Sequence, residues 1–521
     1  MLGRTNRQLD MSESLFDWRG RIPKDSFWWR LATWADQYIR DEDFAGLFSS
    51  TGRPSVSPAK VVRAILVQLE KGYSDRELEE ASAFDERVKL ALGMMRNDPP
   101  LDAVTLCRQR QKLFEGKQGT EILDRTIRVS RETGVFSDDG TAIVDSFLIH
   151  GAAARQDTIT LIRKAVSRVL IIAGFHGRRE QIEGVLVRTD YSRKGKPEIN
   201  WDDAEARRQL LQSLVEDSRR LSAAISGLEP VPEELKQAAA LLARVTEQDI
   251  TEGDDGRIEI KQGVAKDRTV SVNDPEMRHG HKTASYLTDG YKGNIMVGGS
   301  EGQFITAVTV TPANATDASA TPDLIAQTER RASKPEELLG DAAYGDGDSR
   351  VALQSQDINL ISKVPPPASR DGLFNKDHFT INLEEMSVRC PAGHETRTIA
   401  KGNDGRGRKI PVFKFEDRLC ASCPLRVQCT KAKHGRTVRL NYHEKLLQQA
   451  KRHQKTQEFK EKYSRRSAVE RTIAHVTRHG GRYARYVGNA KTEFQMQMAA
   501  ALHNIKAHFT ALMGGAKPVP T

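Results

Sequence analysis

The run TAIVDSFLI at residues 141–149 holds one acidic side chain, Asp145, inside an otherwise apolar stretch. An apolar run of this length is typical of a single strand buried in a sheet. A carboxylate in a buried strand costs free energy unless a cation compensates its charge. The chain is therefore expected to fold around a sheet that brings a cationic group to Asp145.

Other strand and helix signals follow this run in a regular order. Two strands are predicted at NIMVGG (294–299) and QFITAVTVT (303–311), joined by a hairpin turn. Thr321-Pro322 then starts a helix, ELLG ends a fourth strand, a short helix follows, and INLISKV (358–364) is the last strand. Three strands, a helix, a strand, a helix, a strand and a final helix predict an α/β fold with a mixed sheet.

Asp341 stands where the fourth strand runs out into AAYGDG. Loops at the ends of strands often carry chemistry, although a lone aspartate there more often caps a turn. Four other aspartates near predicted strands are interpreted as caps or turn residues: Asp346, Asp348, Asp289 and Asp317. Asp289 and Asp317 could also hold the residues of a site in place through hydrogen bonds.

The last helix, YSRRSAVERTIAHVTRHGG, supplies a third carboxylate. With a rotation of ~100° per residue, one side of a single helix carries Tyr463, Arg466, Glu470 and Thr477. An adjacent apolar stripe that can pack on the sheet consists of Val469, Ile473 and Val476. Glu470 is then expected to meet Asp145 and Asp341 near the strand ends.

Three carboxylates in one place repel each other, by about 4 kcal/mol per pair at ~4 Å and an effective dielectric constant near 20. Divalent cations remove that repulsion. Two Mg²⁺ or Mn²⁺ ions about 3.5–4 Å apart can activate a water or a 3′-hydroxyl on one side of a phosphodiester and stabilise the leaving oxygen on the other. Because oxygen ligands suit these ions better than zinc, two Mg²⁺ or Mn²⁺ ions are the expected cofactors of Asp145, Asp341 and Glu470.

At these residues the chain resembles the DDE transposases of bacterial insertion sequences, in the branch that has an N-terminal helical domain. The family's signature is Tyr, Arg, Glu and Lys at fixed spacing, and Tyr463, Arg466 and Glu470 match its first three members. Thr477 stands at the lysine position, with Arg478 beside it.

The resemblance extends to the strands. DGYKGNIMVGG and TAVTVTPANATD resemble the family's second and third strands, and Asp145 and Asp341 match its two aspartates. It implies a ribonuclease-H-like catalytic domain in which the acidic triad binds two metal ions. It also implies that Tyr463, Arg466 and Arg478 contact the DNA backbone.

The first part of the chain is predicted to form short helices at residues 57–72, 74–93 and 102–115, the second of them starting with a capping box. Short helices with tight connections and a basic last member suit a module that enters a DNA groove, although an ordinary helical bundle with a solvated basic face fits equally well. Arg108 and Arg110 on the third helix are the candidates for contacts to base edges.

Four of the five cysteines follow the pattern C-x29-C-x2-C-x5-C: Cys390, Cys420, Cys423 and Cys429. The first residues lack the apolar run of a secretory signal, so disulfides are not expected. A CxxC pair with two further cysteines favours a structural zinc site over free thiols, and His394 or His434 could replace one ligand. Cys107, alone on a helix, is interpreted as a core residue.

The charge of the chain favours a polyanionic partner. The formal net charge is +10, from 80 basic and 70 acidic residues. The excess is concentrated at residues 451–490, where 11 basic residues stand against 3 acidic ones, and this segment is predicted to bind phosphate. No run of about 18 apolar residues is present, so no membrane partner is expected, and a cytoplasmic, nucleoid-associated protein is.

The predicted domains follow from these motifs. They are a helical DNA-binding domain (1–130), the first catalytic strand (137–150), a helical insertion (151–285), the ribonuclease-H-like core (286–366), a cysteine-containing insertion (367–445), the catalytic and C-terminal helices (446–513) and a tail (514–521).

The predicted function is that of a transposase that binds the terminal inverted repeats of an insertion sequence, as a homodimer on double-stranded DNA, and cleaves and joins DNA there. Two alternatives remain open. One is a metal-dependent nuclease on the same fold that cleaves without strand transfer. The other is a DNA-binding regulator that descends from a transposase and has an inactive catalytic site.

Overall fold

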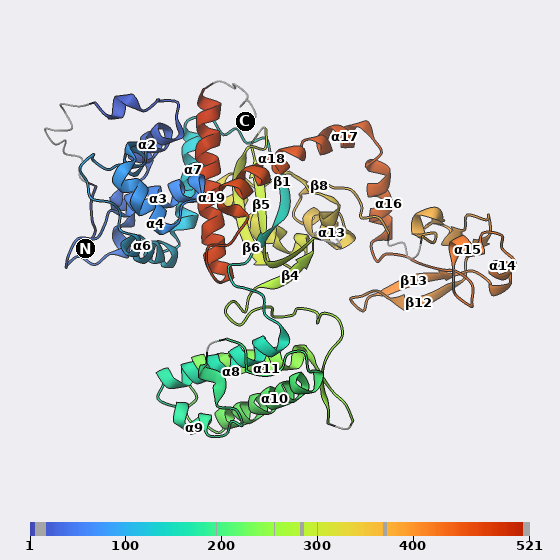
Figure 1. The fold of residues 1–521 in the computed structure, drawn as a ribbon. Coiled ribbons are helices and arrows are strands. Elements are labelled where there is room, and N and C mark those ends of the chain that lie inside the picture. Colours follow the sequence, from blue (N-terminus) through green and yellow to red (C-terminus); the bar gives the residue numbers. More distant parts are fainter. Residues whose placement is uncertain are drawn as a thin grey trace.

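The computed structural model describes residues 1–5, 17–193, 195–254, 256–281, 286–299, 301–367 and 372–513. Its centre is a mixed sheet in the order β6-β5-β1-β7-β8 (Figure 1). The strands are β1 (Thr141–His150), β5 (Leu287–Gly298), β6 (Phe304–Pro312), β7 (Glu337–Leu339) and β8 (Asn359–Ile361), and a short strand β4 (Arg278–His281) pairs with the start of β5. β5 runs antiparallel to β1 and β6, whereas β1, β7 and β8 are parallel. The predicted α/β class, with a ribonuclease-H-like mixed sheet and helices at the N-terminus, is confirmed.

Alternation along β1 gives the sheet two buried faces. Ile143 packs in the core that contains Val469 of α18 (Ser467–Val476) and much of α19 (Asn489–Leu512). Its neighbour Val144 packs in a second core with Leu324 of α12 (Thr321–Arg331) and Leu353 of α13 (Gly347–Gln354). Because side chains alternate along a strand, Asp145 belongs to the α18 side and Ser146 to the α12 side.

The N-terminal helices share the core of the sheet. They are α2 (Phe27–Tyr38), α3 (Pro58–Lys71), α4 (Asp75–Phe84), α5 (Glu86–Leu92), α6 (Ala103–Glu115) and α7 (Gln118–Glu132), with 3₁₀ turns at Arg19–Arg21 and Asp41–Leu47. α19 lies between them and the sheet (Figure 1). The predicted capping box of Ser74 and Glu77 is confirmed, but the single helix expected at 74–93 is two helices, since Asp85 caps α5 through the backbone N–H of Arg87.

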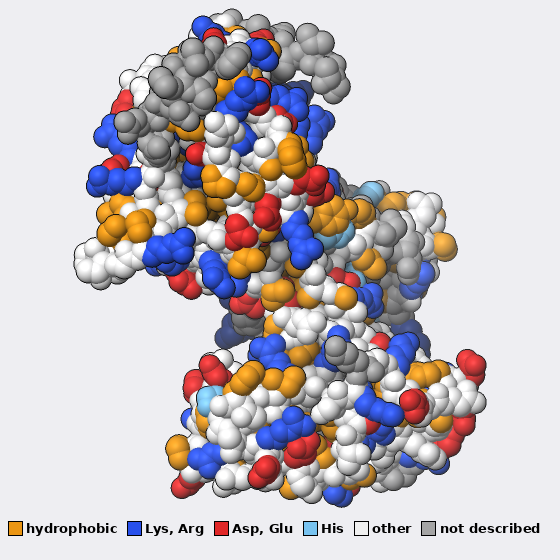
Figure 2. Space-filling view, turned by 60° about the vertical axis from the view of Figure 1, so that its left-hand side comes forward, with side chains coloured by type: hydrophobic (Ala, Val, Ile, Leu, Met, Phe, Trp, Pro, Cys, Tyr) orange, Lys and Arg blue, Asp and Glu red, His pale blue; other side chains and the backbone are white. Residues whose placement is uncertain are grey.

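The helical insertion forms a lobe with its own core (Figure 1). Its elements are α8 (Thr158–Phe175), α9 (Arg179–Glu183), a 3₁₀ turn (Asp190–Ser192), α10 (Ala204–Ser226), α11 (Glu233–Gln248) and the hairpin of β2 (Ile250–Glu252) and β3 (Ile258–Ile260). Figure 2 shows this lobe set off from the rest by a narrow waist, with acidic and basic side chains mixed over its face. Arginines on α10 pair with glutamates: Arg220 pairs with Glu216 one turn away, whereas Arg219 pairs with Glu252 of β2.

The cysteine-containing insertion also has a small core of its own. It contains the 3₁₀ turn Lys376–His378, β9 (Thr380–Asn382), β10 (Ser387–Arg389), β11 (Glu395–Thr396), β12 (Ile399–Asn403), β13 (Lys409–Lys414), α14 (Asp417–Ala421), α15 (Arg426–Cys429) and β14 (Thr437–Arg439). Arg408 of this insertion forms an ion pair with Asp348 at the start of α13, which ties the insertion to the sheet domain.

The chain returns to the sheet through α16 (Glu444–His453) and α17 (Gln457–Ser464). The one long helix expected from Tyr463 onward is wrong, because Arg465 and Arg466 form a turn that separates α17 from α18. A π-helical turn, η7 (Thr477–Gly481), follows α18, and Gly480 with φ +87° ends it as predicted. The domain boundaries stay predictions, and the predicted tail at 514–521 lies outside the described residues. None of the described helices combines the length and apolar character that a membrane span requires.

Candidate active site

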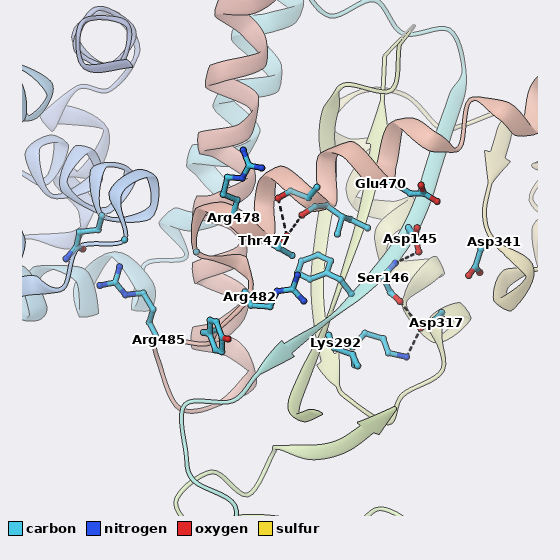
Figure 3. A pocket seen from close by; sticks show the side chains of 18 of the residues that line it. Asp145, Ser146, Lys292, Asp317, Asp341, Glu470, Thr477, Arg478, Arg482 and Arg485 are labelled. Atoms are coloured by element: carbon cyan, nitrogen blue, oxygen red, sulfur yellow. Dashed lines mark hydrogen bonds and ion pairs between the residues drawn. The ribbon is translucent and has the colours of Figure 1, made fainter. Parts of the chain in front are cut away.

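The three predicted carboxylates line one pocket of about 1280 Å³ (Figure 3). Asp145 comes from the middle of β1, Asp341 from the residue pair that follows β7, and Glu470 from the first turn of α18. Three elements far apart in the sequence therefore bring acidic side chains to the same opening, as the sequence predicts.

Asp341 has two roles in this structure. Its Oδ1 accepts a hydrogen bond of 2.8 Å from the backbone N–H of Ala343, so it caps the short helix η5 (Ala342–Tyr344). The same side chain lines the pocket. The cap fixes the carboxylate at the strand end while leaving its second oxygen available.

A cation stands between two of the carboxylates, as a charged group in a buried strand requires. The guanidinium of Arg466 donates to Asp145 Oδ2 at 3.1 Å through Nη1 and to Glu470 Oε1 through Nη2. The ring of Tyr463 lies 5.8 Å from this guanidinium and 5.0 Å from the ammonium of Lys363. Tyr463 and Arg466 thus adjoin the site although the helix breaks between them.

Burial raises the pKa of Asp145 to about 6. The negative charges of Asp341 and Asp317 push it in the same direction, while the backbone N–H of Ser146 and the guanidinium of Arg466 act against the rise. Arg466 therefore compensates only part of the charge, and an additional cation would be favoured next to Asp145.

This imbalance predicts a stability effect without metal. Above pH 6 the wild-type protein carries an ionised Asp145 that the fold disfavours, whereas below about pH 4 the side chain is protonated in both states. Asp145→Asn in EDTA at pH 8 should raise the free energy of unfolding by up to about 3 kcal/mol, and the gain should vanish between pH 6 and pH 4. Thermal melts at a series of pH values test this, and a destabilised variant at pH 8 would contradict it.

The donor set suits a hard divalent ion, although its members are not gathered. Among the described residues, no group of three or more His, Cys, Asp or Glu side chains is arranged so that it could hold a metal ion. At this site the guanidinium of Arg466 lies between Asp145 and Glu470 and pairs with both. The Glu470 side chain is 57 % exposed and can turn away from Arg466. Three carboxylates are ligands of the kind that Mg²⁺ and Mn²⁺ prefer.

The basic segment contributes fewer free cations than its sequence suggests. Three of its members are held by carboxylates of the described chain: Lys451 by Asp377, Lys462 by Glu337 and Arg465 by Asp139. Arg478 lines the pocket, and so do Arg482 and Arg485, which the sequence places only in the basic run (Figure 3). The hydroxyl of Thr477, the residue at the family's lysine position, donates to the backbone carbonyl of Ile473. The positive charge in this turn is therefore that of Arg478.

The two arginines of α6 separate in the structure. Arg108 is exposed. Arg110 is buried, with Nη2 donating to Asp75 at 2.6 Å and Nη1 to the Tyr486 hydroxyl at 3.0 Å. The prediction that Arg110 reads bases is therefore wrong, because its side chain ties α6 to α4 and to the C-terminal part of the chain.

The four predicted zinc ligands line one small void of about 20 Å³, together with His394. Burial raises the pKa of the Cys429 thiol, and the neighbouring Cys420, Cys390 and Cys423 act in the same direction. His434 instead binds Asp417. Cys107 is exposed, which corrects its assignment to the core.

The pocket also contains residues that the sequence did not assign to the site. Lys292 of β5 and Asp317 lie at its floor, paired with each other (Figure 3). Asp317 stood out only as an aspartate beside a strand, and the sole signal for Lys292 was its place in DGYKGN, a segment that resembles a strand of the family.

Two family models match the chain. A model of a transposase DDE domain matches residues 389–508, which include the four clustered cysteines and Glu470, and a model described as a transposase domain (DUF772) matches residues 16–112. No curated protein and no solved structure matches the chain. Both models describe transposase domains. In the sequence, one matched region precedes Asp145 and the other follows Asp341. The two matched regions therefore support a DDE transposase of the insertion-sequence type.

Proposed function

We propose that this transposase binds the terminal inverted repeats of its own insertion sequence and cuts and joins DNA there. In this proposal Asp145, Asp341 and Glu470 are the catalytic residues and hold two Mg²⁺ or Mn²⁺ ions. The observation that carries the proposal is the single pocket in which these carboxylates from three elements meet Arg478, Arg482 and Arg485.

The shape of this pocket suits a DNA backbone. Its far wall is formed by the end of α3, the turn that follows and the start of α4, with Gln68, Ser74 and Glu77, so it extends from the sheet to the N-terminal helices. The arginines on one side supply charge for phosphates, and the carboxylates lie at the other end. When bound, the metal ions would activate the attacking oxygen and stabilise the leaving one. The protein's own part is to fix the scissile phosphate beside the carboxylates.

Metal-dependent cleavage of end DNA tests the proposal directly. Duplexes that carry the ends of the element should be cut with Mg²⁺ or Mn²⁺ and left intact in EDTA. With paired ends and a target duplex, joined products should appear. Cleavage without joining would favour the nuclease alternative, and binding without any cleavage would favour the inactive regulator.

Two arginines are expected to affect DNA binding differently. Arg478 faces the pocket that holds the scissile phosphate, so Arg478→Ala should weaken binding to end DNA and to random DNA alike and lower the log–log salt slope by about one. Arg108 is proposed to reach base edges, so Arg108→Ala should cost ~1–3 kcal/mol on end DNA and much less on random DNA. Titrations of both duplexes at several salt concentrations measure this.

The helical insertion provides the control for that experiment and the next candidate. Residues 151–285 contain 22 basic and 22 acidic side chains, so they lack the charge excess of a phosphate-binding surface. Arg220→Ala in this lobe should leave both affinities unchanged. If Arg108→Ala weakens both duplexes equally, α6 does not read the ends, and base contacts from this lobe should be sought instead.

We also propose that the four clustered cysteines hold one structural zinc ion. All four side chains line a single void, which supports this, and zinc would have to draw them closer together, since the described residues contain no ready-made metal site. Zinc would favour the thiolate form of all four side chains and so reverse the effect that burial has on Cys429. One zinc per chain and a lower melting temperature for Cys423→Ser than for Cys107→Ser are the expected results, since a structural zinc contributes folding energy. Elemental analysis that finds no zinc in active protein would contradict the proposal.

Two DNA ends must be brought together for joining, so we propose a homodimer on DNA as the active form. The mass of the complex formed with paired ends, measured by light scattering, tests this.

A further inference from the structure

A further carboxylate, Asp317, and a lysine, Lys292, lie at the floor of the pocket. Asp317 opens the short helix η4 (Asp317–Ala320), and its Oδ1 accepts from Lys292 Nζ at 2.6 Å and from Ser146 Oγ at 2.9 Å. Both side chains are largely buried, with 14 % of Lys292 and 23 % of Asp317 exposed. Figure 3 shows the pair below Asp145, on the side away from Arg478.

Lys292 and Asp317 lie on the opposite side of β1 from Arg466 and Arg478. β7 pairs with β1 only through Thr141–Ile143, so among the described residues the next part of that edge has no strand partner until His150 bridges to Tyr483. Lys292 stands opposite Leu148 in the register and therefore shares the face of Ser146, whereas Asp145 shares the face of α18. The pocket includes side chains from both faces, so it wraps around this open edge.

The connection to Asp145 is short. The backbone N–H of Ser146 donates to Asp145 Oδ1 at 2.8 Å, while its hydroxyl donates to Asp317. Ser146 thus joins a proposed metal ligand to the carboxylate that holds Lys292. A displacement of Lys292 and a displacement of Asp145 are coupled through two hydrogen bonds of one residue.

Lys292 has donor capacity left over. Its ammonium group has three N–H bonds, and the acceptors in the described chain are Asp317 and the carbonyl of Ala315 at 2.6 Å. A second donor nearby also lacks an acceptor, since the buried hydroxyl of Tyr344 makes no hydrogen bond of normal geometry. Burial raises the pKa of this hydroxyl, and the negative charges of Asp317, Asp145 and Asp341 act in the same direction.

We propose that Lys292, held in place by Asp317 and Ser146, binds a phosphate of the DNA on the side of β1 opposite to Arg466 and Arg478. The scissile phosphate would then lie between two cationic walls. One wall comes from α18 and η7, and the other is this single lysine of β5. Asp317 is the positioning residue of the contact. The inference rests on the proposed function, because it assumes that DNA enters this pocket.

A phosphate-neutralisation experiment tests the contact. Full-length protein is titrated with end duplexes in Ca²⁺, and each duplex carries one methylphosphonate, a neutral replacement for a phosphate, at a different position along either strand. For the wild-type protein, positions near the cleavage site should weaken binding. Lys292→Met keeps the aliphatic stem and should weaken binding to the unmodified duplex about three- to tenfold, with a salt slope lower by about one.

The decisive result is position-specific. At one or two positions the methylphosphonate should weaken the wild-type protein and have no further effect on Lys292→Met, and Lys292→Arg should restore the sensitivity at least in part. Lys236→Ala, at an exposed lysine of α11, is the matched control and should behave as the wild type. If Lys292 had only a structural role, Lys292→Met would weaken binding by the same factor for every duplex, whatever the position of the methylphosphonate.

The outcomes separate this inference from the proposed function. If Lys292→Met retains the wild-type pattern at all positions, the lysine does not touch phosphate and the inference is overturned. If the wild-type protein neither binds nor cuts end DNA, the proposed function itself fails. Melting curves in EDTA show whether Lys292→Met is folded, and Lys292→Gln repeats the test if it is not.

Discussion

Asp145→Asn, Asp341→Asn and Glu470→Gln should each lower the rate of end cleavage by roughly 10³-fold or more, because losing a metal ligand removes several kcal/mol of transition-state stabilisation. Binding to end DNA should change only a few-fold, since none of these residues belongs to the arginine wall of the pocket. Gel assays of cleavage with Mg²⁺, and titrations in Ca²⁺, measure the two quantities on the same duplex.

A matched carboxylate gives the control. Glu458 lies on α17 in the same basic segment, 67 % exposed and away from the pocket lining, so Glu458→Gln should cleave at the wild-type rate. Near-normal cleavage by any of the three pocket variants would remove that residue from the triad. Asp317→Asn should then be measured next, because its carboxylate is the other acidic group beside Asp145.

Local signals predicted most of the fold. The Ser57 cap and Gly72 define α3, the apolar run at 141–149 is β1, and Gly480 ends the turn that follows α18. Each of these depends on one backbone conformation or one periodic pattern that neighbouring residues determine. The approach of Asp145, Asp341 and Glu470 to one pocket followed from the strand order together with the family resemblance.

Tertiary pairing decided what the sequence left open. Arg110 has the same charge and helix as Arg108, yet Asp75 and Tyr486 bury it, and Tyr486 lies 376 residues away. The sequence presents Lys451, Lys462 and Arg465 as free positive charge. In the structure, carboxylates from remote segments form ion pairs with all three. No local pattern encodes such partners, so a basic run overstates the surface that phosphate can reach.

The break between α17 and α18 arises from a similar competition. The helical period favours one helix through Tyr463 and Glu470, but Arg465 binds Asp139 and Thr141 at the start of β1 while Arg466 binds Asp145. Two adjacent arginines thus make separate contacts with the sheet at the point where the helix is interrupted. The interruption brings the guanidinium of Arg466 to the carboxylates. Arg466 is therefore their counter-ion in addition to its proposed contact with DNA.

Arg466→Gln is expected to change two measured quantities in opposite directions. In the structure Arg466 acts as the counter-ion of Asp145 and Glu470, and a divalent ion must displace it to reach both. Without DNA, Arg466→Gln should therefore bind Mn²⁺ roughly 2–30-fold more tightly, since the two partly exposed ion pairs are worth ~0.2–1 kcal/mol each. Cleavage should fall by about 10²–10³-fold, because the freed guanidinium is no longer present to bind the scissile phosphate.

Titration of Mn²⁺ by electron paramagnetic resonance and single-turnover cleavage measure this pair of effects. Arg471→Gln is the control, because Arg471 lies exposed on α18 and its side chain donates a hydrogen bond to Ser467 rather than to a carboxylate of the pocket. Arg466→Lys keeps the charge without the fork that reaches two carboxylates, so both of its values should be intermediate. If Arg466→Gln binds Mn²⁺ more weakly, the arginine supports the metal site instead of competing with it. In that case metal binding would not displace Arg466 from the carboxylates and so would not free its guanidinium to bind the scissile phosphate.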